Sequence, residues 1–417
     1  MFSKQLSLMR NPSFRYFTLS CALAMFGNGL TYIIMIWVLM HFDTSVVSTA
    51  ILMACFWLPN VLFGPFLGVL ADRSNRKYML ILTVSLRAAS LFCFAFIAYF
   101  NQISPFAIYI LATILGTLLA AYIPTALTFV RELVCEKDEL LYANALIDTA
   151  YEIGAVLGMG GAGLILATTS FATCFMINAF CYLLSTILLW KINYKPAQHF
   201  NPFKETFFQQ LIEGGRYISK RVPLLIIYFV QGLFFICYMT APVLLAPFAK
   251  LVLHSSVAQF GWLEAALSAG IVVGGFLSPW LAEVYSLVRV IFTQVIIGII
   301  AFYLFSHTEN VNLAILYHFF IGFAFSSWAL LTTLAQELTD INYQGRIQSL
   351  FNSVSGLIIV LFYYLLAQWK DLPVTSLYVG EICILILAGF LLVIMIYNNR
   401  RLKARSPDLL DEDPVLN

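Results

Sequence analysis

The chain has 417 residues, of which 61% are hydrophobic and 11% are charged, and its formal net charge is +2. Soluble globular proteins contain about 45–50% apolar and about 25% charged residues. A chain this poor in charge cannot cover itself with a water-facing surface, so most of its perimeter must face lipid. The charge gives no indication of a nucleic-acid partner. The eight cysteines lack CxxC or metal-ligand spacing, so we expect neither a disulfide framework nor a metal site.

Apolar stretches of about twenty residues, the length that a helix needs to cross a bilayer, follow one another along the whole chain. Short polar breaks, such as Asn101 to Pro105 and His307 to Asn312, separate them. Each should be a helix, because lipid cannot satisfy a bare backbone. An all-α membrane protein with twelve transmembrane helices is therefore predicted, with spans near 14–40, 47–71, 78–100, 105–130, 142–166, 169–190, 223–249, 257–281, 287–306, 311–336, 347–369 and 375–397.

The basic residues indicate the orientation, because Lys and Arg are enriched in cytoplasmic loops. With the N-terminus inside, all of the 23 basic residues fall on the cytoplasmic side except Lys250, Lys370 and Arg87, the last of which lies within the third helix. An odd number of helices would disrupt this asymmetry. We therefore expect both termini in the cytoplasm.

The longest loop divides the chain into two halves that repeat weakly. Phe66-Leu-Gly68 before Asp72 resembles Phe276-Leu-Ser278 before Glu283, and two related halves predict a pathway at their interface. An amphipathic pattern over 203–221 predicts a helix lying on the inner leaflet. The expected domains are an N-terminal six-helix bundle, a cytoplasmic linker, a C-terminal six-helix bundle and a cytoplasmic tail, over 1–190, 191–222, 223–397 and 398–417.

The segment Gly68-Val-Leu-Ala-Asp72-Arg73-Ser-Asn75-Arg76-Lys77 resembles the G-x-L-A-D-R-x-G-R-K signature between helices 2 and 3 of the Major Facilitator Superfamily. Asn75 replaces the usual glycine, and Asn tolerates a left-handed backbone better than most residues. The resemblance implies a latch at the cytoplasmic side. Its expected residues, including an acidic partner in helix 5, are Gly68, Asp72, Arg73, Arg76, Lys77 and Asp148.

Further stretches, such as Gly27-Asn-Gly-Leu-Thr-Tyr32 and Ala143-Asn-Ala-Leu146, resemble the macrolide-efflux and enterobactin-exporter branch of that superfamily. The resemblance implies a monomeric, proton-coupled exporter of amphipathic, drug-like or siderophore-like molecules in a bacterial inner membrane, without a cofactor. The chain departs from the branch at Asn28, where many members have Asp. The arginine that many proton antiporters carry in helix 4 also has no counterpart, so the coupling acids must lie elsewhere.

Several other functions stay open at this point. The fold permits import of a metabolite or siderophore equally well. A lipid or lysophospholipid flippase and a membrane sensor without transport activity are further alternatives. No GxxxxGK[ST] motif is present, which argues against ATP as the energy source. No nucleophile–base pair or metal cluster indicates an enzyme.

The resemblance implies that helices 1, 4, 7 and 10 line the centre of the cavity and helices 2, 5, 8 and 11 its sides. Polar and aromatic side chains at helical spacing on these helices are the candidate cargo-binding residues. Such residues also hold membrane helices together, so packing is the alternative for each. The abundance of Phe and Tyr favours aromatic or amphipathic cargo over sugars. The candidates are Asn28, Tyr32, Thr117, Thr125, Tyr228, Gln231, Phe235, Tyr238, Ser326, Asn352 and Tyr363.

Ionisable groups at membrane depth are costly and are functional candidates by default. Glu264 in helix 8 is the main candidate for carrying the coupling proton, with His318 at a similar depth in helix 10 as a candidate neighbour. Glu152 in helix 5 is the alternative carrier. Ordinary hydrogen bonding within the bundle competes with these roles. Arg87 is expected to be structural, and Glu381 is expected to reach the membrane surface by snorkelling.

Overall fold

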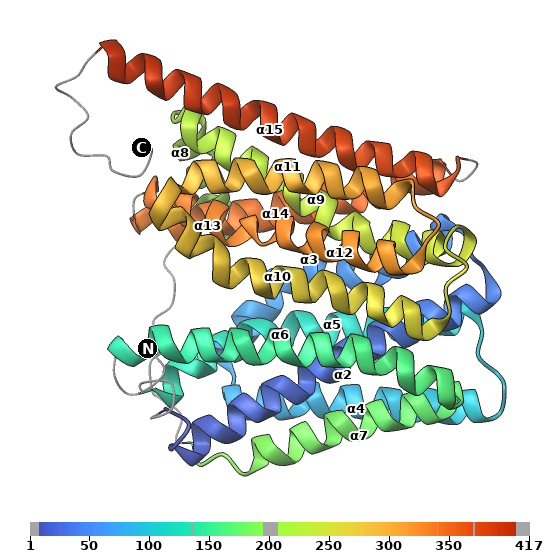
Figure 1. The fold of residues 1–417 in the computed structure, drawn as a ribbon. Coiled ribbons are helices and arrows are strands. Elements are labelled where there is room, and N and C mark those ends of the chain that lie inside the picture. Colours follow the sequence, from blue (N-terminus) through green and yellow to red (C-terminus); the bar gives the residue numbers. More distant parts are fainter. Residues whose placement is uncertain (1–7, 135–136, 195–206, 340, 370–371, 406–417) are drawn as a thin grey trace. The chain divides into compact units, whose positions relative to one another are not determined.

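The computed structural model describes residues 8–134, 137–194, 207–339, 341–369 and 372–405. Within these ranges the regular structure is helical and no strand occurs (Figure 1). The helices are α2 (Pro12–Phe42), α3 (Val46–Arg73), α4 (Arg76–Tyr99), α5 (Pro105–Leu133), α6 (Lys137–Thr168), α7 (Phe171–Trp190), α8 (Phe207–Ser219), α9 (Val222–Leu251), α10 (Val257–Tyr285), α11 (Leu287–Ser306), α12 (Val311–Phe325), α13 (Ser327–Glu337), α14 (Ile341–Gln368) and α15 (Val374–Arg405).

The membrane helices agree closely with the predicted spans. Among the described residues, eleven helical segments are long and apolar enough to cross a membrane, and Val354–Gln368 of α14 is a shorter apolar one. Counted together they give the predicted twelve. The tenth span is divided at Ser326 into α12 and α13, and α15 continues past the predicted end at residue 397 to Arg405.

Polar side chains fix where several helices begin. Asn11, Ser45, Ser104 and Ser170 each accept a hydrogen bond from a main-chain N–H in the first turn of the helix that follows, which satisfies donors that a helix start leaves free. Asn75 does the same for α4, with φ at −66°. The left-handed backbone expected there is therefore wrong: Asn75 replaces glycine as a helix cap.

The chain divides into two compact units. Unit 1 comprises Met1–Pro202 with Ser255–Ala265, and unit 2 comprises Phe203–His254 with Ala266–Asn417. In unit 1, α2 packs against α6 and α7, and α3 against α5; in unit 2, α9 and α11 pack against α15. The first part of α10 thus clusters with the N-terminal helices and its remainder with the C-terminal ones. One continuous helix belongs to both units.

The amphipathic segment in the predicted linker forms α8, which packs on α14 within unit 2. Ile218 of α8 is buried in a cluster with Leu224 and Ile347. The ring of Tyr217 stacks on that of Tyr343 with 4.3 Å between their centroids. These contacts attach α8 to α9 and α14 within unit 2. Its cytoplasmic side and its contact with lipid stay predictions.

Glycines allow close helix crossings in unit 1, one of them between α2 and α6. A methyl group built on Gly158 would overlap the main-chain oxygen of Phe26. Hydrocarbon gives helices no hydrophobic reason to associate, so small residues that let backbones touch are a main source of affinity between them. On the same helix, a methyl group on Gly161 would lie 3.8 Å from the Phe26 ring, which is ordinary van der Waals contact.

Gly158→Ala should therefore destabilise the protein by about 1–3 kcal/mol, the usual cost of overpacking. Gly161→Ala should be neutral or slightly stabilising, because alanine favours helix over glycine. Unfolding of both variants in detergent measures the difference. Equal stability of the two variants would contradict the packing described for α2 and α6.

Candidate functional site

Glu264, the main proton-carrier candidate, is buried in unit 1, with 2% of its surface exposed. It lies eight residues into α10, about 10 Å from the start of that helix at 1.5 Å per residue. The phenol of Tyr32 on α2 donates a hydrogen bond of 2.8 Å to its Oε1. The structure therefore joins two of the residues that sequence analysis selected separately, one as a cargo residue and one as a proton carrier.

Two further contacts hold the first part of α10 against unit 1. Gly261 lies against Gly163 of α6, where a methyl group built on Gly261 would be 3.0 Å from the Cα of Gly163. The rings of Phe260 and Trp37 lie 5.6 Å apart. These contacts fix the part of α10 on which the buried carboxyl group of Glu264 meets the phenol of Tyr32.

The other two proton-carrier candidates have different surroundings. His318 is buried in unit 2, where its ring stacks on Phe305 of α11 at 5.2 Å. The side chain of Glu152 on α6 is exposed. A direct role of His318 beside Glu264 stays a prediction. Within the described part of the chain, no three His, Cys, Asp or Glu side chains gather as metal ligands would.

In unit 2, two cargo candidates belong to one aromatic cluster. The ring centroid of Phe235 on α9 lies 6.0 Å from that of Trp328 on α13 and 6.4 Å from that of Phe351 on α14. Tyr228, two turns earlier on α9, lies 5.8 Å from the same Phe351. The cluster, defined by Tyr228, Phe235, Trp328 and Phe351, spans three helices.

Gln231, on α9 between Tyr228 and Phe235, adds a polar group to this region. Its side chain is 1% exposed, and its amide nitrogen donates a hydrogen bond of 2.9 Å to the hydroxyl group of Thr332. Its Oε1 is buried and has no hydrogen-bond partner among the described residues. A buried acceptor without a donor is costly, so this oxygen is suited to a ligand that carries a donor beside an apolar ring.

The remaining cargo candidates differ in how far protein contacts already occupy them. Tyr363 is buried, and its phenol donates a hydrogen bond of 3.0 Å to the main-chain oxygen of Met239. Tyr238 is exposed, and its ring centroid lies 5.7 Å from that of Phe325. Thr125 is buried and donates 2.7 Å to the carbonyl one turn back.

Thr117, which is half-buried, makes the same kind of bond, and Asn28 is half-buried on α2. Ser326 is buried at the interruption between α12 and α13. Its hydroxyl oxygen accepts a hydrogen bond of 2.8 Å from the side-chain amide of Gln294 on α11. These contacts of Thr117, Thr125 and Ser326 are what helix packing requires. The side chain of Asn352 lies outside the described residues, and the cargo role of all these residues stays a prediction.

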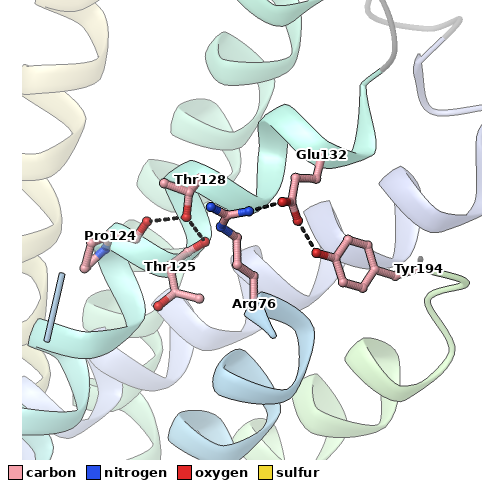
Figure 2. A network of polar contacts seen from close by, with 6 residues as sticks. All are labelled: Arg76, Pro124, Thr125, Thr128, Glu132 and Tyr194. Carbon is pink, nitrogen blue, oxygen red and sulfur yellow. Dashed lines mark hydrogen bonds and ion pairs between the residues drawn. The ribbon is translucent and has the colours of Figure 1, made fainter. Parts of the chain in front are cut away.

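Figure 2 shows the polar network at the start of α4, in the predicted latch. Arg76 forms an ion pair with Glu132 near the end of α5, and the phenol of Tyr194 donates to the other oxygen of the same carboxylate. Burial raises the pKa of the Tyr194 phenol, and the charge of Arg76 opposes this only in part. The phenol therefore stays protonated at neutral pH and remains a donor.

Lys77, beside Arg76, binds the end of α7. Its ammonium group donates hydrogen bonds of 3.0 Å and 2.7 Å to the main-chain oxygens of Trp190 and Ile192. Carbonyls at the end of a helix are free acceptors and carry partial negative charge. Asp148, the expected acidic partner, is exposed. The surroundings of Gly68 and the side chains of Asp72 and Arg73 lie outside the described part of the structure.

Sequence analysis missed four residues of these clusters, which are Glu132, Tyr194, Trp328 and Phe351. Glu132 is the acid that Arg76 pairs with, and the signal for it was an acid at the C-terminal end of a helix in the same bundle. Trp328 completes the aromatic cluster from α13, just after the interruption of the tenth span at Ser326. A straight helix assumed from the sequence could not show this.

Removing either member of the Arg76–Glu132 pair should cost about 1–3 kcal/mol of stability, as expected for hydrogen bonds to charged groups. The variants are Arg76→Gln and Glu132→Gln, with Tyr194→Phe as a milder change. Because the two charges form one network, the double variant should lose less than the sum of the single losses. Strict additivity in thermal unfolding would show that the pair is not coupled.

Comparison with known proteins gives the family. The model of the Major Facilitator Superfamily matches residues 17–363. The MFS-type transporter YfiS of Bacillus subtilis (strain 168) is 24% identical over 371 residues, which cover 84% of this chain and 85% of YfiS. The multidrug efflux pump Tap of Mycolicibacterium fortuitum is 21% identical over 343 residues, covering 79% and 82%.

The Staphyloferrin A transporter of Staphylococcus aureus (strain NCTC 8325 / PS 47) is 24% identical over 212 residues, which cover 48% of this chain and 52% of that protein. Among solved structures, the nucleoside transporter NupG matches with a TM-score of 0.71 at 14% identity, covering 92% of this chain and 98% of NupG. This likeness shows the shared fold. The chain, an all-helical multi-pass membrane protein, is a transporter that belongs to the Major Facilitator Superfamily.

Proposed function

We propose that this transporter exports amphipathic small molecules, drug-like or siderophore-like, in exchange for protons, and that Glu264 carries the coupling proton. The observation that carries the proposal is the enclosed carboxyl group of Glu264, bonded to Tyr32, on a helix that belongs to both units. An inner-membrane location with both termini in the cytoplasm, and a monomeric state, form part of the proposal.

The surroundings of Glu264 favour the neutral form of its carboxyl group. One phenol is the only hydrogen-bond donor described for it, and a buried carboxylate needs a cation or several donors to balance the loss of water. A proton supplies that balance. The enclosed group should therefore bind a proton when it is sealed from water and release it when water enters.

The position of Glu264 on α10 links this proton to movement. Residues up to Ala265 cluster with unit 1 and residues from Ala266 with unit 2. Movement of the first part of α10 away from α2 and α6, within unit 1, would break the Tyr32–Glu264 bond and change the surroundings of the carboxyl group. Exchange of a proton against cargo requires a change of this kind.

The cargo class rests on the aromatic cluster in unit 2 and on Gln231. Four aromatic rings with one free amide oxygen suit a molecule with an apolar ring and few donors. The names of two relatives, a multidrug efflux pump and a Staphyloferrin A transporter, favour the same class. The Arg76–Glu132–Tyr194 network and Lys77 are proposed to form the cytoplasmic latch of the transport cycle.

Glu264→Gln should abolish transport driven by a pH gradient and leave exchange without a gradient intact. The neutral amide cannot release a proton, but it preserves the size of the side chain. The measurement is uptake of ethidium and of erythromycin into proteoliposomes, with an imposed pH gradient and, separately, as counterflow. Gradient-driven accumulation should fall to the level found without a gradient.

Glu152→Gln is the matched control, because it removes another acid of a membrane helix. It should keep gradient-driven accumulation. If the Glu264 variant still accumulates cargo with the gradient while the Glu152 variant does not, the coupling proton resides on Glu152. If the pH gradient drives accumulation of neither compound by the wild-type protein, the export proposal fails.

A further inference from the structure

Unit 2 contains a second buried carboxyl group, which the proposed transport cycle does not use. Glu381 lies eight residues into α15 and is 4% exposed. Sequence analysis expected this side chain to reach the membrane surface, and that expectation is wrong. It turns inward to α9, where it meets the hydroxyl group of Thr240.

The number of hydrogens available at this contact indicates the state of Glu381. The hydroxyl oxygen of Thr240 lies 2.7 Å from the main-chain oxygen of Ile236 and also within hydrogen-bonding distance of Glu381 Oε1. A hydroxyl group has one hydrogen to donate. If Glu381 were ionised, one of these two oxygen–oxygen contacts would contain no hydrogen. A protonated Glu381 donates to Thr240, which then donates to Ile236, and both contacts are satisfied.

The second oxygen of Glu381 supports the same state. Its Oε2 is buried and has no hydrogen-bond partner among the described residues. Leaving a neutral carbonyl oxygen unpaired costs much less than leaving half of a carboxylate charge unpaired at low dielectric. The site therefore accommodates a carboxylic acid and not a carboxylate.

The described contacts of Glu381 are to uncharged groups. A titratable ring beyond them is His318, which stacks on the Phe305 ring that Tyr378 also packs against. On α9 the titratable neighbour is Cys237, whose thiol lies 3.8 Å from the main-chain oxygen of Glu381. On α15 itself, Tyr378 lies one turn earlier, and its ring packs on Phe302 and Phe305 of α11. One turn later, Leu385 packs on Gly298 of α11. No cation is described that would hold Glu381 ionised.

The contact lies beside a weak point of α9. Pro242, two residues after Thr240, lies inside the helix, and a proline there removes one main-chain hydrogen bond and disturbs the preceding turn. A helix weakened in this way depends more on its neighbours for its position. The hydrogen bonds of Glu381 with Thr240 and Cys237 are such a support.

We propose that Glu381 is a proton-binding site of its own, and that its bound proton joins α15 to α9 through Thr240. Loss of the proton places a charge in an apolar contact, separates the two helices beside Pro242 and admits water to Cys237. This proposal does not depend on Glu264 as the coupling residue.

Infrared difference spectra of the full-length protein in lipid nanodiscs test the first part. At neutral pH, wild type minus Glu381→Gln should show the C=O band of a protonated carboxyl group. Thr240→Val should move that band, because the acid loses its acceptor. The band should persist in Glu264→Gln, so failure of the coupling proposal would leave this result unchanged. A carboxylate band in place of the C=O band at neutral pH would overturn the proposal.

Alkylation of Cys237 by a methanethiosulfonate reagent tests the second part, in a variant that retains Cys237 as its single cysteine. As pH rises, the infrared band should disappear over the same range in which Cys237 becomes reactive. In the Glu381→Gln background, Cys237 should stay shielded over that range, because the amide keeps the contact uncharged. Equal reactivity of Cys237 in both backgrounds at every pH would refute the link between α15 and α9.

Discussion

Every polar group that the chain buries at membrane depth must find its partner within the protein, because hydrocarbon offers neither donors nor acceptors. Threonines such as Thr125 return their hydroxyl groups to the carbonyl one turn back. Arg87 is 1% exposed and lies between the rings of Tyr122 and Tyr182, each 5.6 Å away, so aromatic faces supply the stabilisation that water would give. Among the described residues some buried polar atoms keep no hydrogen-bond partner, and two of them, on Gln231 and Glu381, are used in the proposals above.

The same constraint separates two kinds of buried acid. Glu132 faces Arg76 and a phenol, which suits a permanent carboxylate. Glu264 and Glu381 each face one hydroxyl group, which suits a group that holds a proton. The difference follows from depth. Glu132 lies near the helix ends where cations are common, whereas the other two lie inside apolar packing.

Much of the fold could be predicted from the sequence, because hydrophobic length and the distribution of Lys and Arg depend on the bilayer and not on details of packing. The span predicted at 287–306 coincides with α11. Pairings across helices could not be predicted in this way. The burial of Glu381 and the partner of Arg76 depend on how helices rotate about their axes, and the position of Trp328 depends on the interruption at Ser326. The hydrophobic pattern of a lipid-facing helix constrains neither its rotation about its axis nor the position of an interruption.

The central claim is that cargo and proton compete through Glu264. The most direct test is the affinity of the purified protein in detergent for ethidium, measured as a function of pH. By linkage, a ligand that displaces a proton binds more weakly as pH falls. The slope of the logarithm of the dissociation constant against pH reports the number of protons exchanged. The account predicts a slope near one proton (about tenfold per pH unit) for wild type and almost none for Glu264→Gln. Equal slopes for the two proteins would contradict it.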